Sequence, residues 1–141
     1  MLRKLKVLLI EDEKIDALGV GRVLKESYPQ VLLEVLNTGE QALDWIGRFR
    51  LDGVQIALIL MDMTLPRMHG LELLPEIRKN PDLAHSPVIV LSGSDNPDAV
   101  RNAYHSGACA YIMKRPEFAD MKDVLTRIFD FWLGANVLLQ Q

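Results

Sequence analysis

The sequence predicts an α/β protein built on a doubly wound parallel sheet of five strands and five helices. Short, almost wholly apolar segments recur along the chain, and segments with helical spacing of apolar residues lie between them. None of the apolar segments alternates polar with apolar residues, which is typical of strands that helices cover on both faces. A strand followed by a helix, repeated five times, gives such a sheet.

Five segments are expected to form the strands. The strongest cover residues 6–10, 55–61 and 87–91, and each is short, apolar and rich in β-favouring residues. Residues 31–36 and 110–113 are weaker candidates.

The first two helices are expected after the first two strands. The first covers residues from about 14 to 27, where Gly19 and Gly21 each weaken it by about 1 kcal/mol relative to alanine. Thr38 followed by Gln41 has the pattern of a capping box, which predicts where the second helix begins.

The three remaining helices also have local signals. Gly70 precedes the third, in which Pro75 is expected to kink or delay the first turn. Asn96-Pro97 predicts the start of the fourth, with proline at the first helical position. The last helix carries a clean apolar stripe, formed by Met121, Val124, Leu125, Ile128 and Trp132.

The composition predicts one soluble domain over residues 1–141, with 49% apolar and 25% charged residues. The net charge of −3 and the absence of a basic run argue against nucleic-acid binding. No apolar stretch reaches the roughly 18–20 residues of a membrane span, and no signal peptide is recognisable, so the cytoplasm is expected. The single Cys109 excludes an internal disulfide and is expected to be small, buried and unreactive.

Polar side chains follow four of the five strands. Glu11 and Asp12 follow the first, Asp62 the third, Ser92 the fourth and Lys114 the fifth. Because the carboxyl ends of parallel strands share one edge, these side chains are expected to converge where such sheets bind ligands. Each alone has a common structural explanation, as a solvated loop acid, a cap or a surface charge. Their occurrence together is much more specific.

Three adjacent carboxylates either raise a pKa or bind a cation. Mg²⁺ suits such a site because it takes carboxylate and phosphate oxygens. Its two charges and that of Lys114 neutralise the three acids. A carboxylate can then act as a covalent nucleophile towards phosphorus, while the metal and the lysine stabilise the charge on the phosphoryl oxygens.

Over about residues 4–130 the sequence resembles the receiver domain of two-component response regulators, which has a flavodoxin-like topology. The resemblance rests on residues 7–13, 61–70, 90–93 and 110–114. It implies that Asp62 accepts a phosphoryl group from a phosphohistidine on a sensor histidine kinase or phosphotransfer protein. It also implies a Mg²⁺ site made by Glu11, Asp12, Asp62 and the backbone carbonyl of Thr64.

The same resemblance assigns the remaining site residues. Ser92 and Lys114 would bind the phosphoryl oxygens, and Gly93 would be small beside them. Ser92 and Tyr111 would form the switch, with the aromatic ring changing rotamer on phosphorylation. The alternative for Tyr111 is a half-buried aromatic of an edge strand with no switching role.

Two positions depart from the family pattern. Members often have a proline directly after the lysine, joined by a cis bond, whereas here Arg115 precedes Pro116. Whether the Lys114-Arg115 or the Arg115-Pro116 bond is cis is left open. His69 stands where an acid is frequent, and we expect it to be an exposed turn residue.

A closer resemblance is to the small receivers that partner bacterial phytochrome-type histidine kinases. It rests on residues 80–83 and 131–133. Such proteins act without an attached output domain, and we expect none here, neither an output domain nor a DNA-binding domain. Trp132 and Leu133 either belong to the core or form an interface. The extended last helix and apolar tail, residues 131–141, suggest a homodimer or contact with a downstream protein.

Three other functions fit parts of the pattern. A phosphatase using an aspartyl-phosphate would have a second acid at position 64, where Thr64 stands. A flavin or dinucleotide binder would have a glycine-rich first turn instead of residues 11–13. A receiver-like adaptor that is never phosphorylated would lack part of the site, and nothing is missing from it.

Overall fold

The computed structural model describes residues 4–139 and contains one five-stranded sheet in which all neighbouring strands are parallel. The strand order is β2-β1-β3-β6-β7. The strands are β1 (Lys4–Ile10), β2 (Leu32–Leu36), β3 (Val54–Asp62), β6 (Val88–Ser92) and β7 (Ala110–Met113). All five strands were predicted, with ends that differ by no more than two residues.

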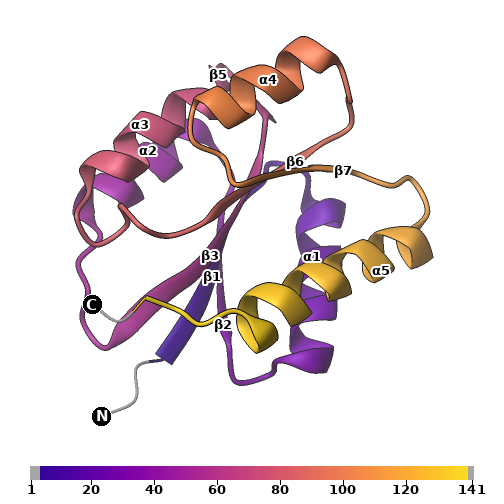
Figure 1. Ribbon diagram of the computed structural model, residues 1–141, viewed down its shortest axis with the longest axis horizontal. Coiled ribbons are helices and arrows are strands. Elements are labelled where there is room, and N and C mark those ends of the chain that lie inside the picture. Colours follow the sequence, from indigo (N-terminus) through magenta and orange to yellow (C-terminus); the bar gives the residue numbers. More distant parts are fainter. Residues whose placement is uncertain (1–3, 140–141) are drawn as a thin grey trace.

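Helices cover both faces of the sheet, as Figure 1 shows. The helices α1 (Lys14–Ser27) and α5 (Phe118–Phe129) lie together on one face. The other face is covered by α2 (Gly39–Arg48), α3 (Leu73–Lys79) and α4 (Pro97–His105). The five helices and the doubly wound topology are confirmed.

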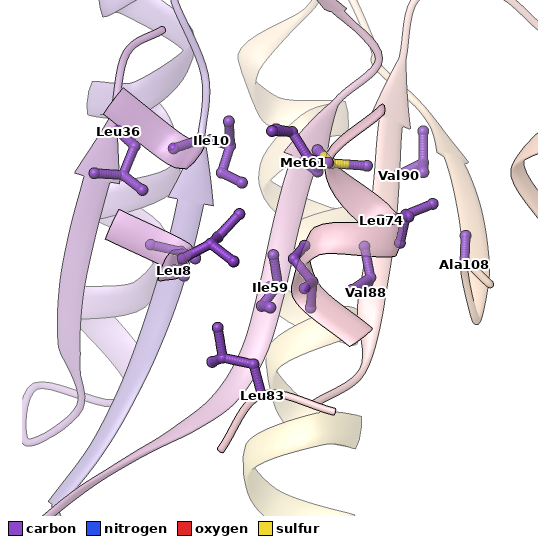
Figure 2. Packing of buried hydrophobic residues seen from close by; sticks show 14 of the residues in the cluster. Leu8, Ile10, Leu36, Ile59, Met61, Leu74, Leu83, Val88, Val90 and Ala108 are labelled. Atoms are coloured by element: carbon purple, nitrogen blue, oxygen red, sulfur yellow. The ribbon is translucent and has the colours of Figure 1, made fainter. Parts of the chain in front are cut away.

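The sheet separates two hydrophobic clusters, and its central strands contribute to both. Alternate residues of β1, such as Leu8 and Leu9, point to opposite faces and are fully buried. Figure 2 shows the cluster on the α2–α3 side, where Ile59 and Met61 of β3 lie near Leu74 of α3. Burial on both faces explains why these strands are continuous apolar runs.

Gly19 of α1 has a packing role, although glycine weakens a helix. A Cβ on Gly19 would lie 3.3 Å from Cε1 of Phe118, the first residue of α5. The Arg22 guanidinium lies 4.9 Å from the centre of the same ring. The helix extends unbroken from Lys14 to Ser27. Close contact with α5 therefore accounts for a residue that weakens the isolated helix.

The capping predictions are confirmed except for one hydrogen bond. Thr38 Oγ1 accepts a hydrogen bond from the Gln41 amide at 3.1 Å, which caps α2. Gln41 Oε1, however, accepts from the Asn37 amide at 2.9 Å, one residue before the position that a capping box uses. Asn96 caps α4 through its side chain, and Pro97 is the first helical residue.

The start of α3 is delayed, as the proline predicts. A short 3₁₀ turn, η1 (Gly70–Glu72), comes first, and Pro75 lies in the first turn of α3. Before it, β4 (Thr64–Leu65) and β5 (Met68–His69) form a small antiparallel hairpin that was not predicted. Arg67 has a φ of 61° at the tip of this hairpin. His69 is exposed, as expected, but it belongs to β5 and not to the turn, and its Nδ1 caps η1.

The last helix differs from the prediction of one extended helix. α5 ends at Phe129, and a π-helical segment, η2 (Asp130–Ala135), continues it. The chain then turns back towards β3, where Gln55 Nε2 donates a hydrogen bond to the Leu139 carbonyl at 2.7 Å. The tail residues 140 and 141 lie outside the described residues.

Three smaller expectations also have an outcome. Cys109 is exposed, so the expectation of a buried residue is wrong; it directly precedes β7, which is an edge strand of the sheet. No cis peptide bond occurs between residues 4 and 139, so both bonds flanking Arg115 are trans. Within the same range, no helix has the length and apolar character needed to cross a membrane.

Candidate phosphoryl-accepting site

The three predicted acids meet at the carboxyl edge of the sheet. β1 and β3 are neighbours with Ile10 beside Met61, so the residues that follow these two come together. One carboxylate oxygen each of Glu11, Asp12 and Asp62 lies within 4.8 Å of the others. Glu11 and Asp62 are buried, and Asp12 is half-buried.

Lys114 supplies the positive charge of the site. Its Nζ donates to Glu11 Oε1 at 2.8 Å and to Asp62 Oδ2 at 3.3 Å. The backbone amide of Lys114 donates to the Ser92 carbonyl at 2.7 Å, which ties the end of β7 to the end of β6. The lysine side chain is 21% exposed, so its charge acts in a partly desolvated environment.

The surroundings of Glu11 and Lys114 raise the pKa values of both side chains, which favours the neutral form of the acid and the charged form of the lysine. Burial, and then the nearby Asp62 carboxylate, raise the pKa of Glu11 from 4.5 to about 7, although Lys114 works against this. Burial on its own lowers the pKa of Lys114, but its hydrogen bonds to Glu11 and Asp16 outweigh burial and raise it above its usual value. The lysine therefore stays positively charged, whereas the neighbouring carboxylates repel one another when they are ionised.

Asp62 is fixed by the loop that follows it. The Thr64 amide donates to Asp62 Oδ1 at 3.1 Å, and the Gly70 amide donates to the Met63 carbonyl at 2.7 Å. A Cβ on Gly70 would collide with the Asp62 backbone carbonyl and lie 3.1 Å from Met63 Cα. Only glycine allows this close approach, which holds the backbone beneath Asp62.

Ser92 ends β6, Gly93 follows it directly, and Tyr111 lies in β7 beside Val90. The sheet register pairs Asp62 with Leu91, so Ser92 is one residue further along β6. Ser92 is buried, and its Oγ accepts a hydrogen bond from the Ser94 amide at 3.2 Å. Gly93 is exposed, with open space where a side chain would project. Tyr111 is half-buried, and its hydroxyl donates to the Ser94 carbonyl at 2.6 Å.

Asp16 is a site residue that the sequence analysis missed. Its Oδ2 accepts a hydrogen bond from Lys114 Nζ at 3.0 Å. Asp16 lies in the first turn of α1, four residues after Asp12. An acid one helical turn beyond Glu11 and Asp12 is the sequence signal that could have indicated it.

The donor set suits a divalent cation. Three carboxylates offer hard oxygen ligands, and their mutual repulsion favours an ion that neutralises them. The chemistry available at this edge is therefore that of a carboxylate beside a cation site, a buried hydroxyl and a lysine. Such a set at the carboxyl edge of a doubly wound sheet can bind a cation and a phosphoryl group side by side.

Comparison with known proteins identifies the class more narrowly. A sequence profile of the response regulator receiver domain matches residues 7–126, and the chain belongs to this family. The response regulator Rcp1 of Synechocystis sp. is 36% identical over 135 residues, which cover 94% of this chain and 91% of Rcp1. The chain is thus a response regulator receiver of two-component signalling.

Two solved structures resemble the whole fold. The Mn²⁺-bound form of Rcp1 has a TM-score of 0.84 and 34% identity, covering 96% of this chain and 99% of that one. The phosphorylated cyanobacterial phytochrome response regulator RcpA has a TM-score of 0.87 and 29% identity, covering 98% of this chain and 99% of that one. Both confirm the flavodoxin-like receiver topology.

Proposed function

We propose that Asp62 accepts a phosphoryl group from a phosphohistidine on a sensor histidine kinase or a phosphotransfer protein. The observation that carries this proposal is that Asp62 belongs to the acid cluster and also contacts Lys114, with a side chain that is 11% exposed. A carboxylate that keeps this exposure at the carboxyl edge of the sheet can reach a phosphohistidine, while its neighbours stabilise the negative charge of the transferred phosphoryl group.

The transfer is a substitution at phosphorus. A carboxylate oxygen of Asp62 forms a bond to the phosphorus atom as the bond from phosphorus to the donor imidazole nitrogen breaks. The imidazole keeps the electron pair and takes up a proton, and Asp62 becomes an acyl phosphate. Ser92 and Lys114 would donate hydrogen bonds to the phosphoryl oxygens, and the open space at Gly93 would leave room for them.

Mg²⁺ is the proposed cofactor. Glu11, Asp12, Asp62 and the backbone carbonyl of Thr64 would hold it. When bound, it supplies positive charge that neutralises the carboxylates and the phosphoryl oxygens. The donor chemistry of the acid cluster supports a hard cation, as does the Mn²⁺-bound form of Rcp1.

The switch would connect the phosphoryl group to the β6–α4 loop. Ser92 Oγ is bonded to the Ser94 amide, and Tyr111 is bonded to the Ser94 carbonyl. A phosphoryl oxygen that draws the Ser92 hydroxyl towards Asp62 would disturb both contacts and free the tyrosine to change rotamer. The phosphoryl group would thereby bias a pre-existing equilibrium between two conformations of the loop.

The proposed donor is a phytochrome-type histidine kinase, because RcpA is a phytochrome response regulator and resembles this chain along its whole length. Output would pass through a protein contact, including a homodimer made by the last helices. Phe131 is 52% exposed and Val137 is 90% exposed, which leaves apolar surface for such a contact. Sedimentation of the wild type and of Phe131→Ser would test the dimer.

We also infer that the protein is a phosphoacceptor with slow self-hydrolysis and is not a turnover phosphatase. Thr64 follows Asp62 by two residues, where a phosphatase of this chemistry would place a second acid. A steady-state assay with small phosphate esters would contradict this inference if it gave sustained rapid turnover.

Phosphotransfer from a kinase tests the proposed function. A purified phytochrome-type histidine kinase is labelled with radioactive phosphate, freed of nucleotide and mixed with this protein and Mg²⁺. The label is expected to move to the wild type and to remain on the kinase with Asp62→Asn. Equal transfer to both proteins would show that another residue is the acceptor.

A further inference from the structure

Asp16 contacts the site lysine from outside the acid cluster. Its Oδ2 lies 3.0 Å from Lys114 Nζ, with 45% of the aspartate side chain exposed and 21% of the lysine. Among the described residues, the converging carboxylates are those of Glu11, Asp12 and Asp62, and Asp16 is not one of them. Asp16 therefore interacts with the lysine and not with the proposed cation ligands.

The ammonium group of Lys114 has three N–H donors and faces three carboxylates. The distances are 2.8 Å to Glu11, 3.0 Å to Asp16 and 3.3 Å to Asp62. The contact with Asp62 is the longest, so the N–H group that makes it is the one that can most readily turn to a phosphoryl oxygen. The contacts to Glu11 and Asp16 then fix the orientation of the ammonium group.

Of these two contacts, the one to Asp16 is independent of the cation. Glu11 has a second proposed role as a metal ligand, so its oxygens are shared. Asp16 is the third residue of α1, whose first turn is closed by the Ala17 amide donating to the Glu13 carbonyl at 3.0 Å. A short side chain on a helix thus holds the end of a long, flexible lysine side chain.

We propose that Asp16 is a positioning residue for phosphorylation: it orients the Lys114 ammonium group over Asp62 before the phosphoryl group arrives. This inference rests on the proposed function of Asp62. Asp16 acts through Lys114 alone, so its effect must disappear when the lysine is absent.

A double-mutant cycle tests this dependence. Phosphorylation by acetyl phosphate at saturating Mg²⁺ is timed for the wild type, Asp16→Ala, Lys114→Ala and the double variant. Asp16→Ala is expected to react about fivefold more slowly, the effect of one partly exposed charge-assisted hydrogen bond. The double variant is expected to react at the rate of Lys114→Ala, because no lysine remains to be positioned.

Asp120→Ala is the matched control. Asp120 is the third residue of α5 and the acid of its first turn, as Asp16 is in α1, but it lies outside the contacts of Lys114. It is expected to react at the wild-type rate. The positioning role is overturned if Asp16→Ala reacts as fast as the wild type or faster. It is also overturned if Asp16→Ala slows the Lys114→Ala protein by the same factor.

A second measurement needs no phosphate. The ¹H–¹⁵N signal of the Lys114 ammonium group is expected to shift and broaden in Asp16→Ala and to stay unchanged in Asp120→Ala. An unchanged signal in Asp16→Ala overturns the positioning role even if phosphorylation occurs. A wild-type protein that gains no phosphate, but shows the shift, overturns the proposed function while confirming the contact between Asp16 and Lys114.

Discussion

Repulsion within the acid cluster predicts that Asp12→Asn stabilises the metal-free protein. The oxygens of Asp12, Glu11 and Asp62 lie within 4.8 Å of one another. At that separation two like charges repel by about 1 kcal/mol in water and about 3 kcal/mol at an effective dielectric constant of 20. Because Asp12 is half-buried and Lys114 offsets part of the repulsion, we expect a gain of about 1–2 kcal/mol in the free energy of unfolding.

Urea unfolding followed by tryptophan fluorescence measures this gain. Trp45 lies in α2 and Trp132 in η2, so the signal reports from both faces of the sheet. In EDTA the variant should unfold at a higher urea concentration than the wild type. With Mg²⁺ the wild type should gain more stability than the variant, because the variant has lost a ligand.

Asp52→Asn is the control, since Asp52 is an exposed acid before β3, at the opposite end of that strand from Asp62. It should change neither the metal-free stability nor the effect of Mg²⁺. The electrostatic account is refuted if Asp12→Asn destabilises the protein in EDTA. It is also refuted if Mg²⁺ stabilises the variant as much as the wild type.

Two further predictions concern pH and the loop after Asp62. A Glu11 pKa raised from 4.5 to about 7 means that stability is fully present below pH 4.5 and is lost as the pH rises to about 7. The loss, at most about 3 kcal/mol, should appear as a lower urea midpoint at pH 8 than at pH 5 in EDTA and should vanish in Glu11→Gln. Gly70→Ala should cost about 2 kcal/mol or more and weaken Mg²⁺ binding, measured by calorimetry, because its Cβ collides with the Asp62 carbonyl. Gly47→Ala, with open space around its Cβ, should cost nothing, and equal losses in both variants would contradict the steric argument.

Much of the fold could be predicted because its signals are local. The three central strands, β1, β3 and β6, carry the apolar runs that burial on both faces of the sheet requires, and α1 begins and ends at the residues expected. The convergence of Asp62 and Lys114 followed from one topological rule, that parallel strands end at one edge. No side-chain contact had to be known for that inference.

The features that escaped prediction depend on contacts between distant residues. The hairpin of β4 and β5 has two residues in each strand, too few to show a periodicity. The π-helical segment η2 lies where Tyr28 donates a hydrogen bond to Asp130, 102 residues away. Asp16 meets Lys114 across 98 residues, because α1 directs its first turn towards the end of β7.

The covalent role of Asp62 is the central claim, and intact mass spectrometry tests it most directly. The protein is treated with acetyl phosphate and Mg²⁺, and the mass of one added phosphoryl group is measured beside an EDTA control. The wild type is predicted to gain one phosphoryl group only when Mg²⁺ is present, and Asp62→Asn is predicted to gain none. A wild type that gains no phosphate, or an Asp62→Asn variant that gains it equally, would contradict the account.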